Sequence, residues 1–326
     1  MTTPTETPPP RWRRWLPGPL ARRLAARLGW SVATLAGTAV FTFLLINLVP
    51  GDVARVLAGP KASPATLKEI RRKYHLEEPL PKRLGYYLAQ VARGDLGRSL
   101  VTDQPVAEAL LARLPATSAL AALAVTGWML MAVPLGVYTA RHQGSWFDRG
   151  VLVAATLSLS LPSFWLAKMV QYWLAYRLGW FPVAGFRGLA SLMLPALTLA
   201  LLFVGFYARL IHTGMVEALA SPYVRTARAK GVSETAILFR HALRNALIPV
   251  VTILATDTAA LLGGVLFTEN VFALPGIGSL AVQSVFNLDV PMIMGTVLFS
   301  ALLVISANLV VDVLYRWIDP RIRAGW

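Results

Sequence analysis

Residues 217–245 read EALASPYVRTARAKGVSETAILFRHALRN, a polar and basic stretch between two apolar segments, 189–211 and 246–267. Each apolar segment is long enough to cross about 30 Å of hydrocarbon as a helix that rises about 1.5 Å per residue. The stretch between them is too long and too rich in helix-forming residues to be a simple connection. This arrangement predicts a membrane protein that offers one ordered polar loop to a partner.

The rest of the chain has the same membrane character. Hydrophobic residues make up 56% and charged residues 14% of the 326 residues, and the mean hydropathy is +0.57, which is outside the range of soluble domains. Because lipid cannot hydrogen-bond the backbone, spans of this length must be helices. We therefore predict an all-α integral membrane protein with six transmembrane helices, at 28–49, 116–139, 151–176, 189–211, 246–267 and 290–315.

The net charge of +15 is distributed as in a membrane protein rather than as in a nucleic-acid-binding protein. Six Arg precede the first span, six Lys or Arg lie between 209 and 244, and the tail 316–326 holds three Arg. The positive-inside rule then places both termini, 1–27 included, and the 217–245 loop in the cytoplasm. Segment 50–115 would lie outside despite its eleven Lys or Arg, because long translocated segments largely escape the rule. We expect the lipid bilayer, and no nucleic acid, among the partners.

The extracytoplasmic segment 50–115 is predicted to be helical. Ser63 followed by Pro64 is typical of a helix start, here of a helix over 65–74. A second helix is expected over 81–92, and Gly94-Asp95-Leu96-Gly97 predicts a turn because glycine tolerates a positive φ. The segment is either a small lid on the span ends or a docking surface for an external partner.

Motifs for catalysis or for cofactor binding are poorly represented. The chain has no cysteine, no HExxH and no Gly-Lys dipeptide, which excludes thiolate metal sites and a phosphate-binding P-loop. We expect neither an enzymatic activity nor a bound cofactor or metal. Gly276-Ile277-Gly278 imitates part of a dinucleotide fingerprint, but it follows a membrane helix instead of a strand. With Pro275 it predicts a tight turn that folds a short helix over the outer mouth.

Ionisable residues inside the spans are few. Asp257 lies near the centre of the fifth span, where an unpaired carboxylate is costly, so it should face the bundle interior or a watery cavity. It is either a pathway residue or a structural hydrogen-bond partner. The other candidate pathway or gate residues follow the same span and are Glu269, Pro275, Gly276 and Gly278.

The loop itself has helix start and stop signals. Pro222 is expected to begin a helix over 223–230, and Gly231 to end it. Ser233 is expected to begin a second short helix that runs towards Arg244. Two such helices at a bend, parallel to the membrane, would bind either a groove of a protein or anionic lipid.

The residues of the loop resemble a known family. YVRTARAKG at 223–231, followed by RHALRNALIP at 240–249, is similar to the cytoplasmic signature of ABC-importer permeases of the dipeptide, oligopeptide and nickel group. Against the wider importer pattern, only Ala227, Gly231 and Leu243 match, and the departures match the variant of the peptide group. Further stretches that look like this family occur in the right order at 48–52, 94–97, 114–117, 275–278 and 319–323.

This resemblance implies a type I ABC importer permease fold with its core over 116–315, in a bacterial inner membrane. It implies a second related permease, two cytoplasmic ATPase subunits that bind ATP and Mg, and an external substrate-binding protein. The long segment after the first span resembles the first permease of the pair, and peptide is the expected substrate in a group that also carries glutathione and nickel chelates. The implied ATPase-coupling residues are Arg225, Thr226, Ala227, Arg228, Ala229, Lys230, Gly231, His241, Leu243 and Arg244.

Two other classes compete with the importer permease. An ion-coupled secondary transporter would usually carry more intramembrane charges and broken helices in repeated halves. A structural or lipid-binding membrane protein would show no substrate flux at all. The ordered series of family stretches favours the permease.

Overall fold

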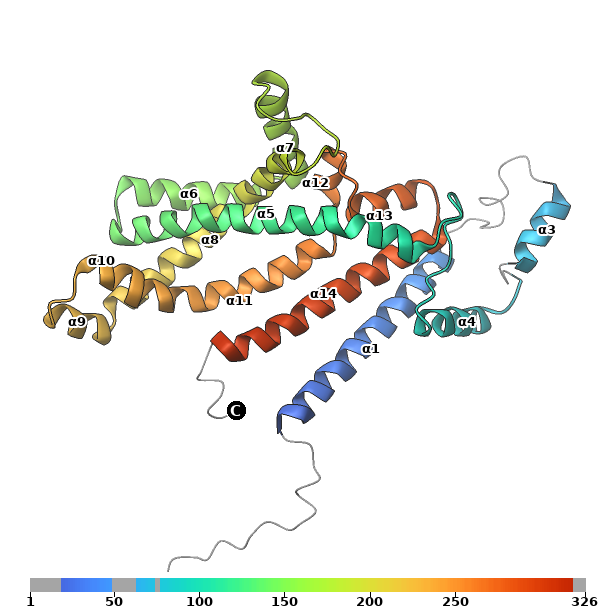
Figure 1. Ribbon diagram of the computed structural model, residues 1–326, viewed down its shortest axis with the longest axis horizontal. Helices are drawn as coiled ribbons and strands as arrows, with labels where there is room; N and C mark the ends of the chain where they lie inside the picture. Colours follow the sequence, from blue (N-terminus) through green and yellow to red (C-terminus); the bar gives the residue numbers. More distant parts are fainter. Residues whose placement is uncertain (1–18, 49–62, 74–76, 319–326) are drawn as a thin grey trace, which may run out of the picture.

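Figure 1 shows a computed structural model of the chain, which describes residues 19–48, 63–73 and 77–318. The elements in these ranges are helical, and the prediction of an all-α protein is confirmed. In chain order they are α1 (Pro19–Leu48), α3 (Pro64–Lys73), α4 (Leu80–Ala92), α5 (Val106–Arg141), α6 (Trp146–Ser160), α7 (Ser163–Val170), the π-helical η2 (Gln171–Arg177), α8 (Ala190–Ala220), α9 (Pro222–Ala229), α10 (Glu234–Ala236), the π-helical η3 (Ile237–Ala242), α11 (Leu243–Leu262), α12 (Leu266–Val271), α13 (Ile277–Phe286) and α14 (Val290–Ile318).

Some predicted features fall outside the described residues. They are the N-terminal residues 1–18, the family stretch at 49–52, parts of the outer segment at 50–62 and 74–76, and the tail from 319 onwards.

Five helical segments are long and apolar enough to cross a membrane. A sixth span results if Trp146–Ser158 and Ser163–Arg177, which meet at a bend of 110°, together form one broken span. The structure thus has five continuous candidate spans and one bent pair, and the predicted number of six is reached when the pair is counted as one. The continuous spans are Ala26–Leu48, Val106–Arg141, Ala190–Ala220, Glu234–Leu262 and Val290–Val310.

The helix predicted over 151–176 is not continuous in the structure. Leu161 has the extended backbone angles φ −79° and ψ 133°, and Pro162 follows it as the cap residue of α7. Proline has no N–H to donate, and its ring disfavours the helical conformation of the residue before it. The chain therefore leaves the helix at this dipeptide and begins a new one at Ser163.

Predicted span ends were also displaced. The second span was expected from 116, but α5 begins at Val106 and contains Pro115 in its interior. Membrane helices tolerate an internal proline because neighbouring groups satisfy the backbone that it frees. The fourth span was expected to end at 211, but α8 continues to Ala220 and includes the first residues assigned to the loop.

The second loop helix was predicted to be separate from the fifth span. In the structure α10, η3 and α11 form one continuous segment, Glu234–Leu262. The polar Arg244 and Asn245 suggested a boundary, but the helical hydrogen bonds depend on the backbone and continue past them. Only α9 is therefore a separate short helix of this loop.

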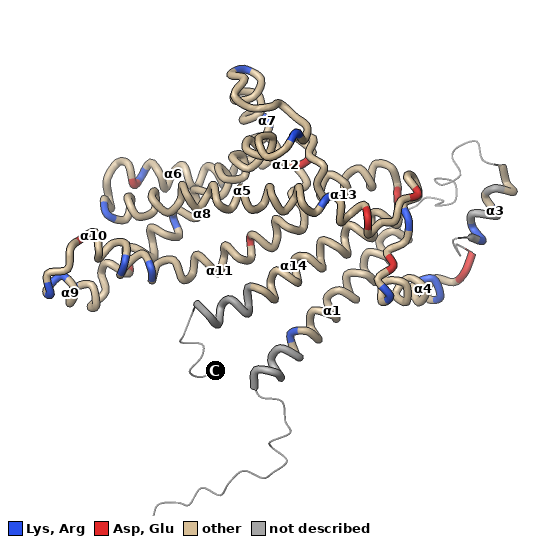
Figure 2. Tube along the Cα trace, in the orientation of Figure 1, with Lys and Arg blue, Asp and Glu red and all other residues tan. Residues whose placement is uncertain are grey.

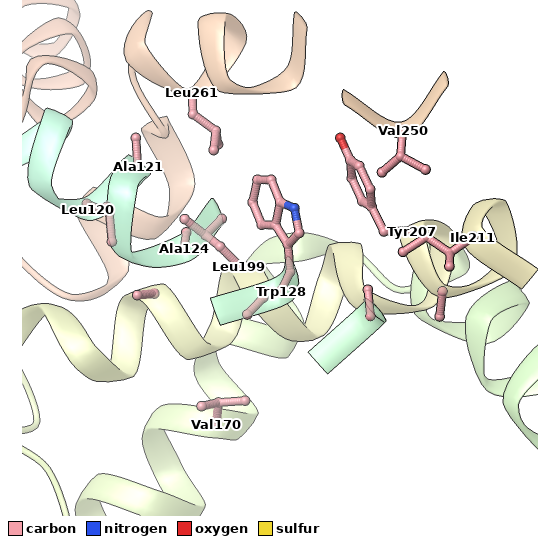
Figure 3. Packing of buried hydrophobic residues seen from close by; sticks show 14 of the residues in the cluster. Leu120, Ala121, Ala124, Trp128, Val170, Leu199, Tyr207, Ile211, Val250 and Leu261 are labelled. Carbon is pink, nitrogen blue, oxygen red and sulfur yellow. The ribbon is translucent and has the colours of Figure 1, made fainter. Parts of the chain in front are cut away.

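The core lies between α5 and α8, the two helices that share the most extensive contact. Figure 3 shows Trp128 of α5 close to Tyr207 and Leu199 of α8 and to Leu261 of α11. The indole of Trp128 stacks on the ring of Tyr207 with 5.7 Å between centroids. In a bilayer such contacts stabilise by close packing, since lipid tails are as apolar as the side chains.

Two glycines permit close helix packing. A Cβ added to Gly136 of α5 would lie 2.7 Å from the carbonyl oxygen of Ala208 in α8. A Cβ added to Gly205 of α8 would lie 2.5 Å from the Cα of Ala155 in α6. Both distances are shorter than atoms can approach, so α5, α8 and α6 can lie at this spacing only with glycine at these positions.

The segment before α5 follows its predicted local structure. α3 begins at Pro64 after Ser63, and α4 runs from Leu80 to Ala92, one residue earlier than predicted. Gly94 and Gly97 have φ of 78° and 80°, which confirms the predicted turn.

Candidate functional site

The predicted coupling segment is held in a defined shape by α9 and the turn that follows it. Pro222 occupies the first turn of α9, as predicted. Gly231 ends the helix with φ of +77°, and the N–H groups of Gly231 and Val232 donate to the carbonyls of Arg228 and Ala227, 3.0 and 3.1 Å away. These two bonds form a Schellman motif, which requires a left-handed residue at position 231.

One side of α9 is anchored on the bundle. Val224 is completely buried, and α9 contacts both η3 and the end of α8. In the first turn of α9, the Tyr223 hydroxyl oxygen accepts a hydrogen bond from the side-chain amide of Asn245 in α11, over 2.9 Å. α9 is thus attached to η3, α8 and α11.

The predicted coupling residues divide into two groups by exposure. Ala227, His241 and Leu243 are partly buried between α9, η3 and α11. The others are exposed and could contact a partner, namely Arg225, Thr226, Arg228, Ala229, Lys230, Gly231 and Arg244.

An ion pair that the sequence reasoning missed closes the turn. Arg228 Nε lies 2.7 Å from Glu234 Oε1, and Arg228 Nη2 lies 3.2 Å from Glu234 Oε2. This fork-shaped hydrogen bonding raises the pKa of Arg228. Arg228 therefore braces the turn, whereas the side chains of Arg225 and Lys230 form no hydrogen bond or ion pair with a described residue.

A second candidate site surrounds Glu269 in α12, whose side chain is completely buried. The Thr117 hydroxyl of α5 donates to Glu269 Oε1 over 2.7 Å, and the Ser279 N–H donates to Glu269 Oε2 over 2.9 Å. Thr117 Oγ1 in turn accepts the N–H of Ile277 at 2.9 Å. Glu269 and Thr117 thus satisfy the first N–H groups of α13, which have no partner within their own helix.

Gly276 and Gly278 lie so close to this carboxylate that neither position has room for a side chain. A Cβ added to Gly276 would lie 2.2 Å from the Glu269 carboxyl carbon and 2.3 Å from each oxygen. A Cβ added to Gly278 would lie 2.9 Å from the Leu266 nitrogen and 3.0 Å from Glu269 Oε2. Pro275 stands directly before this pair, so four of the five predicted pathway or gate residues lie together. As predicted, a short helix, α13, follows the turn.

Burial and hydrogen bonding act on Glu269 in opposite directions. Burial raises the pKa of Glu269, and it outweighs the hydrogen bonds from Thr117, Ser279 and Gly278, which lower it. Arg113 of α5 lies beside this cluster, where its Nη1 donates to Ser279 Oγ at 3.4 Å.

Asp257, the fifth predicted pathway residue, lies elsewhere. The Tyr207 hydroxyl donates to Asp257 Oδ2 over 2.7 Å. The contact joins α8 to α11, so Asp257 faces the bundle as predicted. This hydrogen bond is compatible with both interpretations, a pathway residue and a structural hydrogen-bond partner.

A buried polar cluster near the α9 end of α8 was not predicted. His212 Nδ1 lies 3.1 Å from Thr139 Oγ1 and 3.4 Å from Asp148 Oδ1. Asp148 also accepts the N–H of Gly144 over 2.9 Å and thereby fixes the loop between α5 and α6 against α8. In the part of the chain that the structure describes, no group of three His, Cys, Asp or Glu could hold a metal ion.

Two family models match this chain, one over its N-terminal part and one over the rest. Residues 132–324 match the family described as "Binding-protein-dependent transport system inner membrane component". Residues 20–121 match the N-terminal region described for the membrane component of the same transport systems.

Full-length relatives show the same similarity. A Brucella abortus (strain 2308) protein named as a peptide transport system permease is 42% identical, over 91% of this chain and 97% of the relative. The glutathione transport system permease protein GsiC of Salmonella choleraesuis is 39% identical over the same shares. The dipeptide transport system permease protein DppB of Alkalihalophilus pseudofirmus is 34% identical, over 91% of this chain and 98% of its own length.

Proposed function

This chain belongs to the binding-protein-dependent transport system inner membrane components, and from this premise we propose that it imports dipeptides or oligopeptides as the first permease of a pair. Membership makes it a multi-pass permease subunit that works with a substrate-binding protein and an ATPase. The peptide substrate is supported by relatives that are named for peptide, dipeptide and glutathione transport.

The coupling role of α9 rests on its geometry, which is the observation that carries the proposal. α9 is short, is anchored by the buried Val224, and is closed by a glycine turn and an ion pair. Its outer surface presents Arg225 and Lys230. We assign this surface to a groove in a cytoplasmic ATPase, where two ATPase subunits hold ATP and Mg and a second, related permease completes the pathway.

The charge pattern supports the proposed membrane orientation. Figure 2 shows Lys and Arg gathered towards the ends of the helices, with their middles largely free of charge. The proposal places α9, both termini and the loop between α5 and α6 in the cytoplasm, by the positive-inside rule. α4, α13 and the turn at 94–97 then lie on the outer side.

The hairpin of α12 and α13 is proposed as part of the outer gate. Its turn is packed so tightly on Glu269 that it can move only together with α12. The bond from Thr117 joins this unit to α5, so we expect a displacement of α5 to move the outer hairpin. Alternating access by rigid packed helices is a common device of transporters.

Uptake into proteoliposomes tests the proposal. The chain, the second permease and the ATPase are reconstituted with the binding protein outside, and labelled trialanine is followed. We expect uptake that needs both ATP and the binding protein, and that Arg225→Glu with Lys230→Glu abolishes. Arg187→Glu, an exposed charge between η2 and α8, is the control and should leave uptake intact. Uptake that persists without the ATPase and follows an ion gradient would instead establish an ion-coupled carrier.

A further inference from the structure

A cavity of about 320 Å³ lies between the turn at 99–104, the first turns of α5, and the helices α13 and α14. We call it the α13 pocket. Its polar lining includes Arg113, Gln283, Asn287 and Asp289, and its apolar lining includes Val101 and Leu280. Ligand pockets in proteins typically have volumes of about 300–1,000 Å³. This pocket is therefore of a size for one amino-acid residue with its flanking polar groups.

The carboxylate in this pocket is already satisfied. Asp289 is almost fully buried, and its oxygens accept the Ser99 hydroxyl at 2.5 Å and the Leu100 N–H at 3.1 Å. The N–H of Met292 adds a third bond at 3.4 Å. Asp289 thus fastens the 99–104 turn to the start of α14, and it has little capacity left for a ligand cation.

The cation in this pocket, Arg113, keeps hydrogen-bond donors that no described side chain uses. Among the described residues that line the pocket, Arg113 is the only Lys or Arg. Its hydrogen bond to a described residue is the long one to Ser279 Oγ, and it forms no ion pair with a described carboxylate. A guanidinium has five N–H donors in a planar fork that matches a carboxylate. Because Asp289 is occupied by its own hydrogen bonds, the half-buried Arg113 is the group in this pocket that would bind an added anion.

We propose that the α13 pocket binds the carboxyl-terminal residue of the transported peptide, with Arg113 as the ligand of the free carboxylate. The exposed side-chain amides of Gln283 and Asn287 stand at the rim and can bind the peptide backbone, while Val101 and Leu280 receive a small side chain. This inference rests on the proposed function and adds to it a substrate contact made by the permease itself.

Binding of trialanine and of trialanine amide to the assembled transporter tests this site. The complex of permeases and ATPase is held in nanodiscs without binding protein and without ATP, and both peptides are titrated. We expect the free acid to bind about tenfold more tightly than the amide, as for one charge-assisted hydrogen bond. In Arg113→Gln this preference should vanish, and in Arg113→Lys it should be reduced. Arg93→Gln, which removes an exposed charge beyond α4, should keep the preference.

Three outcomes would overturn the assignment. The first is equal binding of acid and amide by the unmodified complex, and the second is an Arg113→Gln complex that keeps the preference. The third is an Arg113→Gln complex that binds both peptides normally but no longer captures the binding protein, because the occupant would then be an acidic side chain of that protein. Gel filtration and ATPase capture confirm that each variant is assembled. Trialanine uptake by the unmodified transporter shows separately whether the proposed function holds.

Discussion

The substitution Gly276→Ala is expected to break the contact between Glu269 of α12 and the start of α13. The alanine Cβ would stand 2.2–2.3 Å from the three carboxyl atoms of Glu269, more than 1 Å inside van der Waals contact. Because the carboxylate is buried and held on both oxygens, it cannot turn aside without losing its bonds from Thr117 and Ser279. At about 1.5–3 kcal/mol for each bond to a charged group, we expect Gly276→Ala to destabilise the protein by about 3–6 kcal/mol.

Thermal unfolding of the purified chain in detergent measures this loss. At roughly 2 °C or more per kcal/mol, the unfolding temperature of Gly276→Ala should fall by at least about 5 °C. Gly85→Ala in α4 is the matched control, because a Cβ at Gly85 would meet no atom within 4 Å. That change should be neutral or should stabilise the helix by about 0.5–1 kcal/mol. An unfolding temperature of Gly276→Ala within 1–2 °C of the unmodified chain would refute the packing argument.

Three further predictions concern single contacts. Since the pKa of Glu269 is raised in the folded state, the protein should lose stability relative to Glu269→Gln as pH rises from about 4.5 through the raised value; a pH-independent difference in unfolding temperature would contradict this. Tyr207→Phe should cost about 1–3 kcal/mol in detergent unfolding because it leaves the Asp257 carboxylate without its donor. If Tyr207→Phe costs as much in a protein that already carries Asp257→Ala as it does in the unmodified protein, the bond is not the cause. Arg228→Glu should weaken ATPase capture, and Arg228→Glu with Glu234→Arg should restore it in a pull-down; failure of the swap would mean that Arg228 contacts the ATPase directly.

Local signals predicted the parts of the fold that depend on neighbouring residues. Pro222 and Gly231 predicted both ends of α9, because proline suits a first helical turn and glycine suits a left-handed end. The apolar segments predicted the spans, because a bilayer sets a minimum length. The break at Pro162 could have been predicted, because proline disfavours the helical conformation of the residue before it. It was missed because the residues on both sides form one long apolar run.

Contacts between distant segments could not be predicted. Thr117 and Glu269 are 152 residues apart, and no local pattern indicates that they meet. Gly276 and Gly278 were predicted as a tight turn, whereas neither has a positive φ and both are needed for the approach to Glu269. The same holds for Asp148, His212 and Thr139, which come from three separate elements. Pairings of this kind arise from tertiary packing, and only coordinates can reveal them.

Site-specific cross-linking tests the central claim that α9 docks on an ATPase. The chain has no cysteine, so one introduced thiol is unique within it. Lys230→Cys, carrying a short photoreactive group, is assembled with the partner permease and ATPase in membranes, beside Arg187→Cys as control. We expect an ATPase adduct from position 230 whose yield changes when ATP is bound, and no adduct from position 187. No adduct from position 230 in an assembled complex, or equal adducts from both positions, would contradict this claim.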